Sequence, residues 1–269
     1  MTPPAPGPDQ LTALWEHWQQ QLRPLAATAR PALLPHLRAV DQDQAVDVTL
    51  TLALSGFAVP VRTAASVLAA AGPAAQLEGW PAAVPPLDPD PAASRAGVAA
   101  DALAALDGWV AALVQARLAT LRLLQGTPPG ELLPAAVLAW HEALVHPAVA
   151  AGLVPAVRAT GPRLFFHDGA PAPVAVAPCV ARMWALAAAE PAWDVRALLL
   201  HLAVLWIRPW PGANGRLARL LLNTLRCAAG HRWLLLAPAR REAYREACGA
   251  AQAGDARPFA GLVAVAAAR

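Results

Sequence analysis

The sequence predicts a mainly α-helical protein with one short β-hairpin. Most of its 269 residues fall into alanine- and leucine-rich segments in which apolar side chains recur at helical spacing. One of these segments, residues 195–207, is apolar on nearly every side, which is typical of a buried helix, and it is too short to span a membrane. Two β-prone runs on either side of Asp168-Gly169 indicate the hairpin, at about residues 163–176.

The elements follow one another in four regions. Residues 1–10 are proline-rich, and we expect them to be disordered. Residues 11–130 form an N-terminal helical region, with helices predicted at 11–29, 41–54, 60–71 and 94–124. Residues 131–255 form a core that contains the hairpin, with helices at 132–144, 178–189, 195–207, from 214 onward and at 240–251. Residues 256–269 carry an apolar C-terminal helix, predicted at 259–268.

Composition excludes several classes of function. Every basic residue is arginine, and the high alanine and proline content resembles a GC-rich coding bias, so the net charge of +3 does not indicate nucleic-acid binding. The three cysteines are far apart, which predicts neither a disulfide framework nor a zinc site. We find no signal peptide and no apolar run of about 18 residues, and therefore expect a cytoplasmic protein with no membrane or nucleic-acid partner.

The segment after residue 207 carries the chemistry. Prolines at 209 and 211 end the buried helix, and Gly212-Ala213-Asn214-Gly215 can supply a tight turn into the next one. A glycine-rich turn before a helix leaves backbone N–H groups and a positive dipole end free for an anion. Arg216 and Arg219 share one face of that helix, and Arg208 enters the turn from the other side. The segment therefore predicts a phosphate site, although arginines that are solvated or paired with carboxylates would give the same pattern.

Residues 208–219, Arg-Pro-Trp-Pro-Gly-Ala-Asn-Gly-Arg-Leu-Ala-Arg, resemble the signature of Fic (Fido) domain proteins, H-x-F-x-[D/E]-[A/G]-N-[G/K]-R-x-x-R. The resemblance implies a Fic-type helical bundle in which the hairpin is a flap. In that family the loop binds nucleotide phosphates, and most members transfer AMP from ATP to a protein hydroxyl. The implied nucleotide-binding residues are Arg208, Gly212, Ala213, Asn214, Gly215, Arg216 and Arg219.

Two positions depart from the signature. Arg208 stands where the family has its catalytic His, and Gly212 stands where it has an acidic residue that binds Mg²⁺. A general base must titrate near the working pH, whereas arginine stays protonated, and glycine has no metal-ligating side chain. We therefore expect a degenerate member that binds ATP or another nucleotide with weak or absent dependence on Mg²⁺. AMP transfer would be impaired, and no residue is assigned as catalytic or as a metal ligand.

The resemblance assigns two further regions. The flap would include Phe165, Phe166, His167 and Asp168, and a protein target would bind beside it as an added strand. The family's inhibitory motif, [S/T]-x-x-x-E-[G/N], presses its Glu against the second arginine of the signature. The matching residues here are Thr51, Ser55 and Gly56, with serine in place of the glutamate.

Three functions stay open at this point. The first is the degenerate nucleotide-binding protein. The second is an active adenylyltransferase, or another phosphoryl or nucleotidyl transferase, in which a different group replaces the missing His. The third is a protein-interaction module without enzymatic activity. We expect His201 to be a core histidine, and His141 and Glu142 to have scaffold roles.

Overall fold

The computed structural model describes residues 6–25, 44–71, 95–152, 173–210 and 212–267. These ranges contain helices and their connections and no strand. The elements, in chain order, are α1 (Pro8–Leu22), the 3₁₀ turn η1 (Arg23–Leu25), α3 (Gln44–Leu54), α4 (Val61–Ala70), α6 (Ala100–Leu124), α7 (Pro129–Ala150), α8 (Pro173–Ala189), α9 (Trp193–Ile207), α10 (Asn214–Ala228), the 3₁₀ turn η4 (Pro238–Arg240), α11 (Arg241–Gln252) and α12 (Arg257–Ala267).

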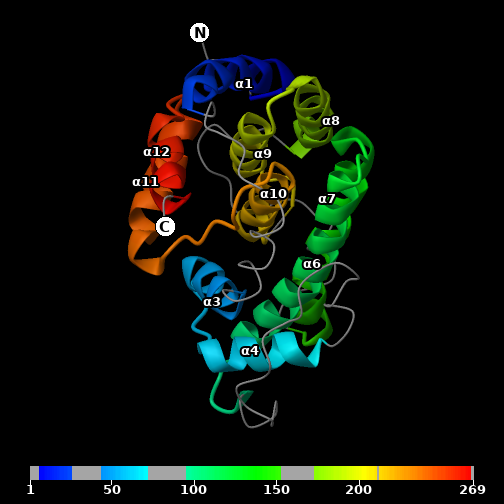
Figure 1. The fold of residues 1–269 in the computed structure, drawn as a ribbon, viewed down its shortest axis with the longest axis vertical. Helices are drawn as coiled ribbons and strands as arrows, with labels where there is room; N and C mark the ends of the chain where they lie inside the picture. The colour runs from blue at the N-terminus through cyan, green and yellow to red at the C-terminus, as the bar shows by residue number, and fades with distance from the viewer. Residues whose placement is uncertain (1–5, 26–43, 72–94, 153–172, 211, 268–269) are drawn as a thin grey trace.

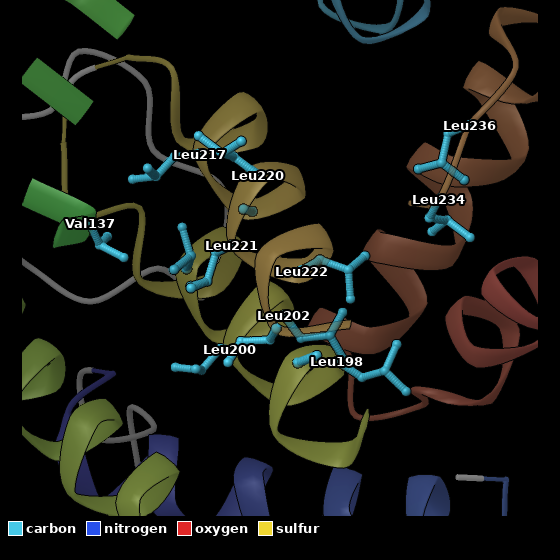
Figure 2. Close-up of a cluster of buried hydrophobic side chains, with 14 of the residues drawn as sticks. Val137, Leu198, Leu200, Leu202, Leu217, Leu220, Leu221, Leu222, Leu234 and Leu236 are labelled. Carbon is cyan, nitrogen blue, oxygen red and sulfur yellow. The ribbon is translucent and has the colours of Figure 1, made fainter. Parts of the chain in front are cut away.

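The helices α9 and α10 lie at the centre, with the other helices arranged around them (Figure 1). Nearly every residue of α9 from Val195 onward is buried, as its uniformly apolar sequence predicts. Figure 2 shows how leucines of α9 and α10 meet one another and face side chains from α7 and from the segment before η4. The labelled members of this core are Val137, Leu198, Leu200, Leu202, Leu217, Leu220, Leu221, Leu222, Leu234 and Leu236.

The pair α6 and α7 packs against one side of α10. Gly108 of α6 permits the close approach, because a Cβ atom there would lie 2.6 Å from the backbone oxygen of Leu144 in α7. On the other sides, α1 and α8 cover one end of α9, and α11 packs beside it with α12. The helices α3 and α4 pack against each other and against α6, and α3 also contacts η4.

Several element boundaries differ from the sequence prediction, and residues 8–10, which we expected to be disordered, belong to the first turn of α1. The second half of the predicted hairpin is wrong over residues 173–176, because α8 begins at Pro173. Proline suits the first helical position, where its missing N–H costs nothing, so the valine-rich run after it continues as helix. The helix α1 gives way to η1 at Arg23, before Pro24, and α6 begins only at Ala100. The flap residues Phe165, Phe166, His167 and Asp168 lie outside the described part of the chain.

Two helices, α6 and α7, are long and apolar enough to cross a membrane by length and composition. The helix α6 is mostly buried within the bundle, and α7 packs along it. A core helix of a soluble protein passes the same test, so the two helices are weak evidence for a membrane location.

Candidate functional site

The loop between α9 and α10 is held in an unusual backbone conformation. Arg208 (φ 47°, ψ 63°) and Ala213 (φ 59°, ψ 1°) are the only non-glycine residues with positive φ in the described ranges. The segment 212–215 was expected to supply a tight turn, and within it Ala213 has the positive φ while Gly215 is already helical. Each strained residue costs about 1–3 kcal/mol, a cost that persists only where the surroundings enforce the conformation.

Asn214 enforces part of this conformation. Its side-chain oxygen accepts a hydrogen bond from the backbone N–H of Trp210 at 3.2 Å, and its Nδ2 donates to the backbone oxygen of Trp210 at 2.5 Å. The amide therefore closes the loop onto the first residue of α10. Asn214 is among the predicted nucleotide-binding residues, and its side-chain amide is hydrogen-bonded within the loop.

His141 supports the loop from α7. Its ring stacks on Trp210, with centroids 4.7 Å apart and planes 16° from parallel, and its Nε2 lies 3.2 Å from the backbone oxygen of Gly212. Burial is the main reason that its pKa falls to about 4, with a further lowering by the charge of Arg216 and an opposing rise from the bond to Gly212. The imidazole is therefore neutral at physiological pH.

The N-terminus of α10 is open. Ala213 occupies the N-cap position, and no side chain in the described ranges caps the helix. The first intrahelical bond runs from Leu217 N to Ala213 O at 2.9 Å, so the N–H groups of residues 214–216 have no acceptor within the helix. Free amides and the positive end of the helix dipole together favour an anion at this position.

Arg216 adds a charge without a partner. Its guanidinium lies over the Phe57 ring, 5.5 Å from the centroid, and its buried Nη1 has no hydrogen-bond partner among the described residues. Burial, and secondarily the charge of Arg219, lower its pKa to about 10, so the group remains protonated at neutral pH. A buried donor of this kind is costly unless a ligand satisfies it.

Arg219 is buried and contacts the C-terminal turn of α3. Its Nη2 donates to Thr51 O at 3.1 Å and to Ser55 Oγ at 2.8 Å, and its guanidinium lies 5.7 Å from the centre of the Tyr244 ring. Thr51, Ser55 and Gly56, the residues that match the inhibitory motif, thus lie at the second arginine of the loop. Ser55 offers a neutral hydroxyl to that arginine rather than a carboxylate.

Two further buried polar residues surround Arg219. Asp47 lies on α3, one and two helical turns before Thr51 and Ser55. Burial raises its pKa to about 7, against a lowering by the Trp233 side chain and, to a smaller extent, by the charge of Arg219. His201 of α9 meets the Tyr244 hydroxyl at 3.2 Å and stacks on Phe259. Burial is the main cause that lowers the pKa of His201 to about 3, so the His201 imidazole is a neutral side chain of the core.

Arg208 begins the loop with a half-buried side chain. Burial lowers the pKa of its guanidinium from the ordinary value, yet arginine keeps its proton in proteins. The glycine at position 212 presents no side-chain oxygen, and the described residues contain no group of three or more His, Cys, Asp or Glu suited to a metal ion.

Sequence reasoning missed the contacts of His141, Phe57, Tyr244 and Asp47 with this region. Their only signals were compositional: Tyr244 is the single tyrosine of the chain, and Asp47 is an acidic residue within an apolar segment. These signals do not point to the loop, because each contact arises between elements distant in sequence.

Searches with family models and among curated proteins gave no match. Solved structures do match. C. elegans Fic-1 superposes with a TM-score of 0.63 at 18% identity, covering 96% of this chain and 71% of that one. A Fic domain containing signaling protein from Bacteroides thetaiotaomicron gives 0.57 at 11% identity, covering 96% and 91% of the two chains. A Fic family protein from Desulfovibrio desulfuricans gives 0.53 at 18% identity, covering 100% and 74%. The chain therefore has the fold of Fic-domain proteins.

Proposed function

We propose that this Fic-fold protein binds the phosphates of ATP or another nucleotide at the N-terminus of α10 and transfers AMP to protein hydroxyls poorly. The observation that carries the proposal is the uncapped N-terminus of α10 beside the buried, unpartnered Nη1 of Arg216. Free amides and a guanidinium that lacks an acceptor together form the donor set that a phosphate group requires.

The charges around the loop support a polyanion as ligand. Arg216 and Arg219 are buried or half-buried cations, and Arg208 stands at the other end of the same loop. In Fic proteins, as the resemblance implies, an acidic residue at the position of Gly212 binds Mg²⁺, and this ion neutralises part of the phosphate charge. Gly212 does not fit such an ion, and the permanent charge of Arg208 supplies part of that neutralisation instead.

The same substitutions weaken catalysis. A general base must release and accept a proton near neutral pH, and Arg208 does neither. His141 does not replace it, because the Nε2 that faces the loop donates its hydrogen to the Gly212 oxygen. Loss of the base alone reduces the rate of such a reaction by about 10² to 10⁴. The predicted flap and a protein target beside it remain part of the proposal, since residues 153–172 lie outside the described ranges.

Titration calorimetry with ATP in chelator tests the binding function. The wild-type protein should bind without metal, and Arg208→His should bind about tenfold or more weakly, since a charge-assisted contact contributes roughly 1.5–3 kcal/mol. Arg208→His combined with Gly212→Asp should make binding depend on Mg²⁺. Arg122→Gln, which removes an exposed arginine on α6, is the matched control and should bind like the wild type. Absence of nucleotide binding by the wild type would refute the proposal.

Transfer is tested with labelled ATP, Mg²⁺ and candidate protein targets. We expect no labelling at a rate near that of an ordinary Fic adenylyltransferase. Clear Mg²⁺-dependent labelling that Asn214→Ala abolishes would instead support the active-transferase alternative.

A further inference from the structure

We propose that His141 is a positioning residue for the phosphate site: from outside the loop, it turns the Gly212 carbonyl away from the bound anion. The inference rests on the proposed function, because it concerns how the same site is kept ready for phosphate. His141 belongs to α7 and lies 71 residues before Gly212.

Three contacts link α7 to the first turn of α10. His141 Nε2 meets the Gly212 oxygen at 3.2 Å, and the His141 ring stacks on Trp210. The backbone of Trp210 is in turn held through both its N–H and its C=O by the side chain of Asn214. A displacement of His141 would therefore reach the residue that begins the helix.

The pattern of these bonds is what an anion loop needs. A backbone carbonyl that faced the phosphate would repel it, whereas an N–H group would bind it. Two carbonyls of this loop, those of Trp210 and Gly212, are each engaged by a side-chain N–H. The amides of residues 214–216 have no acceptor within α10 and remain for the ligand.

The chemical state of His141 suits this role. A carbonyl oxygen can only accept, so the neutral imidazole must carry its proton on Nε2. The ring is buried, and Arg216 is the charged group whose field lowers its pKa. His141 thus supplies a hydrogen-bond donor to the loop without adding a further positive charge beside Arg216 and Arg219.

The experiment separates the donor from the ring. His141→Gln keeps an N–H at about the position of Nε2 and removes the stack, whereas His141→Phe keeps a ring on Trp210 and removes the donor. Each variant is titrated with ATP in chelator, and its thermal unfolding is recorded. We expect His141→Phe to bind at least about fivefold more weakly, because the Gly212 carbonyl then lacks the donor that holds it away from the anion. His141→Gln should retain most of the affinity, even if it unfolds at a lower temperature.

The controls assign each outcome. Glu142→Gln changes the exposed next residue of α7 and should bind like the wild type. If His141→Phe does not fold, His141→Asn, whose amide is too short to reach Gly212, takes its place and should lose affinity in the same way. If the wild type binds no ATP, the proposed function fails. If the wild type binds and His141→Phe binds equally well, or if affinity follows the melting temperature instead of the donor, only the positioning role fails.

Discussion

The two ends of α10 differ in how their polar groups are satisfied. At the C-terminal end, Gly230 N donates to Cys227 O at 3.0 Å and His231 N donates to Arg226 O at 2.9 Å, with Gly230 at φ +90°. This is the Schellman arrangement, in which glycine adopts the left-handed conformation without strain. At the N-terminal end the left-handed residue is Ala213, and the helix has no side-chain cap.

The helix α10 also carries two asparagines, each of which bonds both the N–H and the C=O of one residue outside the helix. Asn223 accepts from Leu234 N at 2.8 Å and donates to Leu234 O at 3.2 Å, and Asn214 makes the same pair of bonds with Trp210. The asparagines are alike, but the cations beside them are not. Near the C-terminal end, Asp194 lies 2.8 Å from His231. Burial lowers the pKa of Arg226, and the field of Asp194 opposes that lowering. No carboxylate among the described residues lies beside Arg216 in this way, and this difference supports the proposal that the N-terminal end is the one that binds a ligand.

The largest effect on this comparison should come from Asn223→Ala. The change leaves the N–H and C=O of Leu234 unpaired in a buried segment, which should cost about 2–4 kcal/mol in the free energy of unfolding. Urea unfolding measures the loss, and calorimetry on the folded protein should give an unchanged affinity for ATP. A loss of affinity larger than the loss of stability would mean that the two ends are not separate in function.

Acid should remove the stabilisation that His141 gives to the N-terminal end of α10. Its pKa is about 4 in the folded protein against an ordinary 6.5, so the unfolded chain takes up a proton first as the pH falls. The contribution of His141 to stability is therefore present above pH 6.5 and is lost by about pH 4, a change of about 3 kcal/mol. His201 acts in the same direction, whereas Asp47, whose pKa is raised, acts in the opposite one.

Urea unfolding of the wild type and of His141→Gln at both ends of this pH range isolates the share of His141. The wild type should lose more stability than the variant on acidification. Equal losses in the two proteins would show that the imidazole of His141 is not protected from protonation in the folded state.

Replacing the arginine at each end of α10 by glutamine tests the comparison further. Arg216→Gln should lower the affinity for metal-free ATP about tenfold or more, because a charge-assisted bond to phosphate contributes roughly 1.5–3 kcal/mol. Its stability should be unchanged or higher, since a buried charge without a partner is removed. Arg226→Gln should do the reverse and lower stability with affinity intact. The same pattern in both variants would contradict the division between the ends.

The smallest effect should come from the two left-handed residues. Ala213→Gly relieves a positive φ and should stabilise the protein by less than about 1 kcal/mol, with little change in affinity. Gly230→Ala introduces the same strain at the other end and should destabilise by about 1 kcal/mol. Thermal unfolding of the two variants gives both signs, and a destabilising Ala213→Gly would mean that the loop needs the stiffness of alanine.

The sequence predicted the parts of the site that lie close together along the chain. The apolar run, the proline stop and the arginine spacing are local patterns, and the structure places α9, the loop and α10 accordingly. Contacts across long separations left no such pattern. Ser55 meets Arg219 over 164 residues and His141 meets Gly212 over 71, and both depend on how α3 and α7 pack. The sequence predicted a tight turn but not that Arg208 and Ala213 would adopt positive φ, because local propensity does not account for the closure of a loop between two buried helices.

The close approach of Gly108 to Leu144 links the spacing of α6 and α7 to the loop between α9 and α10. Leu144 lies three residues after His141 on α7, so a side chain at position 108 that displaced α7 would also move His141 relative to Gly212. Position 108 lies on α6 and has no part in the loop, yet even one methyl group there would have to displace α7. A substitution at this glycine can therefore change the conformation of the loop between α9 and α10 while every residue of the loop is preserved.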